Sequence, residues 1–457
     1  MSARMSAFET TVQTWAQQQW GTVDLGDVRL NRRAVAIGAR MAAAPDRHLP
    51  QQMADRAQLV ATYRLLDNSA VGHPSLSQPH WQSTRQHAGD YPLVLLIQDV
   101  STLDYTHYAE TMTGLGPVGN GGGRGLLLHT TLAVVPSSQQ VLGLAHQHLF
   151  VRRPNPRPTQ KRRPKAERES RVWGEAVTAI GGPPEGSRWV MVADAGADVT
   201  DAMLRCRRVG MDFTLRAGYE RRLVTDDNGV AYLLPTVRRW TPEVGTWVDL
   251  PAQDKRPARR AHLQVSFGCV AVRTPKPEPA LRVWIVRVWE VEPPDGAEAL
   301  EWLLTTSVAV ETPEAALERV AWYRLRWLVE DYHQCLKTGC QVEHRDFEDA
   351  ARIERLLGFL AIIAVRLLQL RQAARLTPDA PATDVVDPLL VQLLAARLTL
   401  EAQSLTLHAF WRGVAQLGGF VGRRRDGEPG WKTLWRGWMY LDTLAQGVRL
   451  AAAFPSG

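Results

Sequence analysis

The hydrophobic pattern of the chain changes from helical to strand-like near Tyr91 and returns to helical near Pro313. Early in this central region, Leu93–Ile97 is a continuous apolar run of the kind that forms a buried strand, and it is followed by Gln98 and Asp99. Such a strand needs neighbours on both sides and layers above and below it. The pattern therefore predicts a sheet domain in the middle of the chain, between helical parts.

Further strands are predicted after this one. The runs Leu126–Val135 and Val141–Val151 predict a hairpin, and after a helical stretch the run Trp189–Ala193 predicts a strand that ends at Asp194. Residues 212–308 are also rich in strand patterns. Strands that alternate with helices predict an α/β fold.

Residues 1–75 have helical spacing. Asp27 is placed to cap a helix whose apolar residues recur at i, i+4, i+7 and i+11, namely Leu30, Ala34, Ile37 and Met41. The net charge of this region is only +2, from eight Lys/Arg and six Asp/Glu. Charge alone therefore does not predict that residues 1–75 bind DNA.

Length and composition exclude several classes of protein. The 457 residues suggest about three domains, and 45% hydrophobic with 22% charged residues is ordinary for a globular protein. Four scattered cysteines without a C-x-x-C pair exclude a disulfide scaffold and make a structural zinc site unexpected. No apolar run is long enough to span a bilayer. We expect a soluble, cytoplasmic protein, and the net charge of +7 favours a polyanionic partner.

Much of that charge lies in one connector. Residues 152–171 contain nine Lys/Arg and two Glu, which gives a net charge of +7. A solvated loop and a segment that contacts phosphates both fit this composition, and the concentration of charge favours the second interpretation.

Three carboxylates are the candidates for chemistry. Asp99 and Asp194 each follow a predicted buried strand, which is where α/β folds place their sites. The third is Glu330, on a helix predicted from about Pro313 through Lys337. At about 100° per residue, this helix projects Glu330 within about 60° of three other side chains: Tyr323, Arg326 and Lys337. This face could be a solvated stripe or the lining of a site for metal and phosphate.

The spacing Tyr323-x2-Arg326-x3-Glu330-x6-Lys337 resembles the Y-R-E-K signature of bacterial insertion-sequence transposases with a DDE triad, a group that moves composite resistance transposons by cut and paste. Further motifs of that family occur in the expected order: Leu25-Gly26-Asp27-x-Arg29, Tyr63-Arg64, Asp99-x-Ser101-x-Leu103-x-Tyr105, Glu169-Ser170-x2-Trp173, Asp194-x3-Asp198, Glu301-Trp302 and Leu417-Gly418-Gly419-Phe420. The similarity covers nearly the whole chain.

The resemblance implies three domains: helices at 1–75 that bind the transposon end, a ribonuclease-H-like catalytic domain at 76–376 with a β-rich insertion at about 220–305, and a helical dimerisation domain at 377–457. The partners implied are double-stranded DNA at transposon ends and target, and a second copy of the chain. It also implies a location in the bacterial cytoplasm, at the nucleoid. No membrane partner is expected.

The resemblance also assigns residue roles. It makes Asp99, Asp194 and Glu330 the catalytic, metal-binding triad. Tyr323, Arg326, Lys337 and Arg216 would contact DNA, and Trp302 would stack on a base flipped during hairpin formation. Three carboxylates suit two Mg²⁺ ions about 3.5–4 Å apart, for which Mn²⁺ can substitute. Relatives often have Asp-Arg-Glu-Ala-Asp where this chain has Asp194-Ala-Gly-Ala-Asp198, which changes the local charge and leaves the triad whole.

The function expected is a transposase that cleaves its terminal inverted repeats by hydrolysis and hairpin formation and joins them to target DNA. The alternatives are a stand-alone metal-dependent nuclease, which would cut without joining, and a non-catalytic DNA-binding protein derived from a transposase. A two-carboxylate glycosidase fits less well, because the Lys and Arg residues on the Glu330 face suit phosphate.

Overall fold

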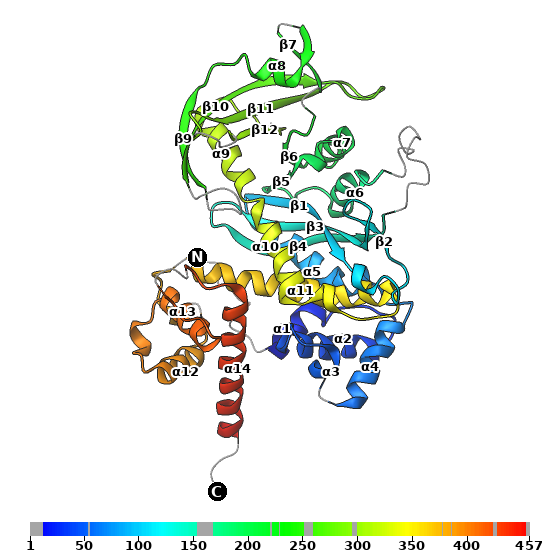
Figure 1. The fold of residues 1–457 in the computed structure, drawn as a ribbon, viewed down its shortest axis with the longest axis vertical. Coiled ribbons are helices and arrows are strands. Elements are labelled where there is room, and N and C mark those ends of the chain that lie inside the picture. Colours follow the sequence, from blue (N-terminus) through cyan, green and yellow to red (C-terminus); the bar gives the residue numbers. More distant parts are fainter. Residues whose placement is uncertain are drawn as a thin grey trace.

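The computed structural model places a large sheet between helical parts (Figure 1). The N-terminal helices, drawn in blue, and the C-terminal helices, in orange and red, lie below the sheet, and the strand-rich segment in green lies above it. The structure describes residues 12–53, 55–152, 168–219, 222–227, 229–250, 259–294, 299–376, 378–384, 386–423 and 427–453.

The N-terminal helices follow from local capping and spacing. They are α1 (Val12–Trp20), α2 (Val28–Ala43), α3 (Leu49–Gln52), α4 (Arg56–Asp67) and α5 (His73–Ala88). The predicted cap of α2 is confirmed, because the Asp27 carboxylate accepts a 2.7 Å hydrogen bond from the Arg29 amide. Ala34, Ile37 and Met41 are buried on the predicted face of this helix.

The sheet combines antiparallel and parallel pairing. Its central strands lie in the order β4 (Gln140–Phe150), β3 (Gly123–Val135), β1 (Leu93–Asp104), β5 (Arg188–Ala193) and β6 (Asp212–Arg216). The pairs β4–β3 and β3–β1 are antiparallel, whereas β1–β5 and β5–β6 are parallel. The predicted hairpin and the predicted end of β5 at Ala193 are therefore confirmed.

The strand-rich segment extends the same sheet. It contains β7 (Leu223–Asp226), β8 (Gly229–Tyr232), α8 (Leu233–Val237), β9 (Val244–Leu250), β10 (Arg259–Val272), β11 (Leu281–Glu290) and β12 (Glu301–Thr306). The last of these strands, β12, returns to pair with β6 in antiparallel fashion, while the short strand β2 (Gly116–Val118) lies at the other side beside β3. The chain between β6 and β12 is thus anchored to the core at both of its ends.

Helices cover both faces of the central strands. In β1, Leu95 and Ile97 belong to one core, whereas Val94 and Leu96 belong to the other, as the two-residue period of a strand requires. The first core contains α5 and α11 (Ala350–Leu376), and the second contains α6 (Arg171–Ile180) and α7 (Thr200–Val209). Burial on both faces explains why the Leu93–Ile97 run is continuously apolar.

The helix predicted from Pro313 through Lys337 is divided into three parts, so that prediction is wrong in its continuity. The parts are α9 (Pro313–Arg324), α10 (Trp327–Gln334) and a π-helical turn at Cys335–Gly339. At the junction, the amides of Leu328 and Val329 bond to carbonyls three residues back, at Leu325 and Arg326. The backbone at the junction keeps right-handed helical angles, so hydrophobic spacing cannot reveal the change.

The C-terminal helices after α11 are α12 (Pro388–Leu398), α13 (Leu407–Leu417) and α14 (Trp431–Ala453). Two tryptophans of α14 pack inside this chain: Trp435 and Trp438 are buried, and the Trp438 ring lies 5.2 Å from that of Trp411 on α13. Within the described residues, no helix combines the length and apolar character needed to cross a bilayer.

Candidate active site and nucleic-acid surface

Asp99 lies where β1 loses its parallel neighbour. The pairing of β1 with β5 ends at Gln98 and Ala193, whereas β1 stays paired with β3 from Asp99–Thr130 to Asp104–Gly125. The prediction that β1 ends before Asp99 is therefore wrong, because β3 supports the strand through Asp104. Asp99 still faces an open edge, since β5 no longer covers that side.

Asp194 follows the last residue of β5. Its carboxylate accepts a 2.9 Å hydrogen bond from the Gly196 amide and so caps the short turn Ala195–Ala197. Because Gln98 and Ala193 are partners in the parallel ladder, Asp99 and Asp194 follow neighbouring positions on adjacent strands. Strands in a sheet are about 4.7–4.9 Å apart. The fold thus brings two of the predicted carboxylates to one edge.

Glu330 is linked to this edge of the sheet by its ion pair with Arg326. The Arg326 guanidinium and the Glu330 carboxylate are 2.5 Å apart, and helix α10 packs against β1. Burial alone would lower the pKa of Arg326, but the hydrogen bond to Glu330 and the negative charge of Asp99 help to raise it. Arg326 therefore lies in the fields of both carboxylates and connects them electrostatically.

Tyr323 lies on the Asp194 side of Arg326. Burial raises the pKa of its phenol; the positive charges of Arg326 and Arg216 oppose this shift, and the negative charge of Asp194 adds to it. Arg216 is exposed at the carboxyl end of β6, and the Trp302 ring lies 6.1 Å from the Tyr323 ring. The structure therefore gathers these three predicted DNA contacts near Asp194.

Lys337 lies apart from the other predicted site residues. It belongs to the π-helical turn, and its ammonium group is 3.5 Å from the Glu343 carboxylate. Its charge also lowers the pKa of Asp104, after larger contributions from Thr106. Asp104 is five residues along β1 from Asp99, or about 17 Å. The predicted face is thus an extended row from Tyr323 to Lys337 instead of one compact site.

Two residues around Asp99, His333 and Thr130, were missed by the sequence analysis. The His333 Nδ1 is 3.5 Å from an Asp99 oxygen, and its Nε2 is 3.1 Å from the Thr130 hydroxyl on β3. His333 is buried and lies one helical turn after Glu330. Its position in Glu330-x-x-His333 was the available signal, but only the fold shows that His333 lies beside Asp99.

The second aspartate of the Asp194-Ala-Gly-Ala-Asp198 sequence lies away from the metal candidates. The Asp198 side chain is completely buried, 2.6 Å from the Arg222 guanidinium and 2.8 Å from the Gly218 amide. Burial raises the pKa of Asp198, although Arg222 and Gly218 oppose the shift. Asp198 therefore connects the turn after β5 to the segment after β6.

The chemistry of the three carboxylates suits a hard divalent cation, because carboxylate oxygens are the ligands such ions prefer. Among the residues that the structure describes, no three acidic, histidine or cysteine side chains converge closely enough to hold an ion. The Glu330 carboxylate is instead bound by Arg326. Carboxylates brought together without a cation repel one another, and a paired arginine relieves that repulsion.

A basic face was also missed, on α2. This 16-residue helix has four arginines and no acidic residue: Arg29, Arg32, Arg33 and Arg40. They line a cavity of about 520 Å³ between α2 and α4, and within the described residues none of them forms an ion pair. The net charge of +2 for residues 1–75 concealed this concentration. The basic connector cannot be compared in the same way, because residues 153–167 lie outside the described part of the chain.

Carboxylates at the open edge of a mixed sheet, with arginines beside them and a separate arginine-rich helix, define an enzyme that acts on a polyanionic chain. Family models identify the class. The chain matches the model for transposase DNA-binding at residues 12–71, the transposase DDE domain at 186–366 and the transposase Tn5 dimerisation domain at 362–456. The protein belongs to the DDE transposases.

Several expectations are thereby confirmed. The DDE domain implies a ribonuclease-H-like core, in agreement with the mixed central sheet. The protein is a DNA transposase that depends on a divalent metal, binds DNA and forms a homodimer. Asp194 and Glu330 lie within the DDE match, whereas Asp99 precedes it and is joined to it by the pairing of β1 with β5.

Proposed function

We propose that Asp99, Asp194 and Glu330 are the catalytic and metal-binding residues of this transposase. The observation that carries the proposal is the parallel register of β1 and β5, which brings Asp99 and Asp194 to the same edge, with Glu330 linked to that edge by Arg326. A set of three carboxylates suits two Mg²⁺ ions, with Mn²⁺ as a substitute. When bound, such ions activate water or a 3′-hydroxyl and stabilise the leaving oxygen.

The basic residues near this edge would bind the DNA backbone. Arg326 and Arg216, near Asp99 and Asp194 respectively, would neutralise charge at the cleaved phosphate. Lys337, beside Asp104, would contact a phosphate farther along the same strand. Lys337 follows Tyr323 by 14 positions, or about 21 Å at helical rise, which is long enough to follow several nucleotides.

The reaction we propose is cut and paste. The carboxylate edge would nick the terminal inverted repeat, form a hairpin on the opposite strand, open it and join the end to target DNA. Trp302, next to Tyr323 and only partly buried, would stack on the base that leaves the helix when the hairpin forms. His333 would orient Asp99 through its contact with Thr130.

The domain roles follow the matched segments. We propose that residues 1–75 bind the transposon end through the α2 arginines, that residues 76–376 catalyse, and that residues 377–457 dimerise. Helix α11 connects the last two parts, since it packs against α5 and β4 of the catalytic domain and against α13 and α14.

The test uses the full chain and the DNA that borders its gene, where inverted repeats mark the ends. Cleavage is followed with Mg²⁺, with Mn²⁺ and with chelator, and hairpins are detected on denaturing gels. Metal-dependent nicks, hairpins and joined products are expected. Nicks without hairpins or joining would indicate the nuclease alternative, and end binding without any cleavage would indicate a non-catalytic DNA-binding protein.

A further inference from the structure

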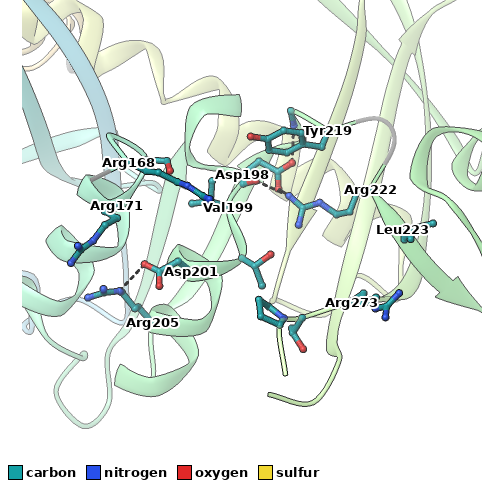
Figure 2. Close-up of a pocket in the computed structure, with 15 residues that line it drawn as sticks. Arg168, Arg171, Asp198, Val199, Asp201, Arg205, Tyr219, Arg222, Leu223 and Arg273 are labelled. Carbon is teal, nitrogen blue, oxygen red and sulfur yellow. Dashed lines mark hydrogen bonds and ion pairs between the residues drawn. The ribbon is translucent and has the colours of Figure 1, made fainter. Parts of the chain in front are cut away.

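A cavity of about 1200 Å³ opens beyond the carboxyl ends of β5 and β6, between α6, α7 and the strand-rich segment (Figure 2). Asp198, four residues after Asp194, lies in its wall, as does Gly218, two residues after Arg216. The chain that follows β5 and β6, and with them Asp194 and Arg216, therefore leads directly into this cavity. In α/β sheets, ligands bind in the crevice outside the carboxyl ends of the parallel strands.

The cavity has an excess of positive charge. Figure 2 shows arginines on its two sides: Arg168, Arg171 and Arg205 on one, Arg222 and Arg273 on the other. Inside the cavity, Arg222 pairs with Asp198 at 2.6 Å and Arg205 with Asp201 at 2.9 Å. Arg171 also pairs with Glu175 at 2.7 Å, and Glu175 is not one of the lining residues. Five arginines and two aspartates leave a formal charge of +3 among the described lining residues.

The wall nearest the carboxylate edge is held in place. Asp198 is buried and accepts hydrogen bonds from the Gly218 amide and the Arg222 guanidinium. Gly218 also packs closely on the turn after Asp194: a Cβ at this position would lie 2.7 Å from the Ala195 carbonyl oxygen. The position of this wall is therefore tied to that of Asp194.

The cavity and Lys337 lie on opposite sides of the carboxylate edge. Lys337 lies beside Asp104, on the part of β1 that pairs only with β3. The cavity lies instead beyond β5 and β6, which follow β1 in the sheet order on the other side. DNA that contacts Lys337 and passes the carboxylates would therefore continue toward the cavity.

We propose that this cavity binds the phosphate backbone of the DNA beyond the cleaved bond, an inference that rests on the proposed function. A volume of about 1200 Å³ exceeds the roughly 300–1,000 Å³ of small-ligand pockets, and a surplus of arginines suits phosphates that recur along a strand. Before cleavage, the DNA that occupies the cavity would be the donor DNA flanking the transposon end. At the joining step it would be the target DNA. The chemistry of recognition is the same for both.

The test changes two arginines on opposite sides of the cavity, Arg171→Gln and Arg273→Gln, in the full chain. The matched control, Arg188→Gln with Arg208→Gln, removes the same charge at the other ends of β5 and α7, where both side chains are 58% exposed. Binding is measured against salt on transposon ends with and without flanking duplex. Joining of precut ends to a supercoiled plasmid is measured in parallel.

If the cavity binds the donor flank, the log–log salt slope falls by about 1.8 on flanked ends, at about 0.9 per lost phosphate contact, and does not change on flush ends. If it binds target, precut ends bind normally but join more slowly. A change in both assays indicates that the same cavity binds the donor flank before cleavage and the target DNA at joining. Each result supports the proposal when the control variant resembles wild type.

Cavity and control variants that behave alike in both assays would overturn the inference, as would an equal loss of slope on flush and flanked ends. If the double variant does not fold, Arg273→Gln alone is used, with about half the change in slope. Failure of the proposed function is a separate result, because wild-type protein would then fail to cleave at all.

Discussion

The carboxylate edge of the sheet and the basic face of α2 use arginine in opposite ways. On α2, four arginines share one helix with no acidic residue and, in the described chain, have no ion-pair partner. At the edge, Arg326 is paired with Glu330, and farther along β1 Lys337 is paired with Glu343. The α2 charges are free to meet phosphates, whereas the paired charges are held at defined positions.

This difference separates affinity from chemistry. Contacts with phosphate tolerate some freedom of the side chain, because the interaction depends mainly on charge. Catalytic groups must be held within a fraction of an ångström of their working geometry, which requires partners around them. Variants at the edge should therefore change rates with little effect on affinity, and variants on α2 should do the reverse.

The largest effect is expected from Asp99→Asn, Asp194→Asn and Glu330→Gln. Each replacement removes a charge proposed to bind metal, so metal-dependent cleavage should fall by at least about 10³-fold. Binding to the transposon end should change little. Nicking assays and gel shifts on the same end fragment measure both quantities, and a variant that cleaves at the wild-type rate would exclude its residue from the triad.

Insertion of one alanine between Leu328 and Val329 should abolish cleavage as well. It would rotate Glu330 by about 100° relative to Arg326 and break their ion pair. It would also rotate His333, and with it the contact to Asp99. End binding through α2 should survive.

The control for this insertion is Leu328→Met, which keeps the helical register and should cost less than about 1.5 kcal/mol. Circular dichroism and thermal melting are compared for both proteins. An insertion variant that is folded and cleaves normally would show that Glu330 and Arg326 do not need their observed arrangement, and the proposed role of Glu330 would be wrong.

A smaller effect, on affinity, is expected on α2. Arg32→Gln with Arg40→Gln should lower the log–log salt slope of end binding by about 1.8 if both side chains contact phosphates. At saturating protein, the cleavage rate of bound DNA should stay close to wild type. An unchanged slope would mean that this basic face does not bind the end, while a lower rate at saturation would contradict the separation of affinity from chemistry.

The smallest change to overall activity is expected from Trp302→Ala, because only one step should be affected. First-strand nicking should persist while hairpin formation falls. Trp302 also packs against the core, and truncation of a fully buried Trp costs about 3–5 kcal/mol, so melting temperature is measured too. A variant that is stable and forms hairpins normally would remove the stacking role, whereas early melting with loss of every step would indicate a core residue.

Much of the local structure could be predicted from the sequence. The cap at Asp27, the hairpin of β3 and β4 and the end of β5 before Asp194 are all recovered. Each depends on residues close together in the chain, where a capping carboxylate or the period of buried side chains acts directly. The resemblance located Asp99, Asp194 and Glu330, but their roles stay predictions.

Other features could not be predicted because they depend on distant partners. Strand β1 continues beyond Asp99 because β3, more than twenty residues later, supplies its hydrogen bonds. The π-helical turn at Cys335–Gly339 and the tight junction before α10 change only the hydrogen-bond pattern of a segment that has ordinary helical composition. No local pattern encodes either change.

The sequence by itself determined most of the helical and strand segments, which carboxylates are the candidates for chemistry, and the family to which their spacing belongs. Only the tertiary structure decided that Asp198 is buried against Arg222, that His333 lies beside Asp99, and that arginines from α7 and the strand-rich segment surround one cavity. The physical reason is that periodicity and capping act within a few residues, whereas burial and charge pairing depend on which distant surfaces meet.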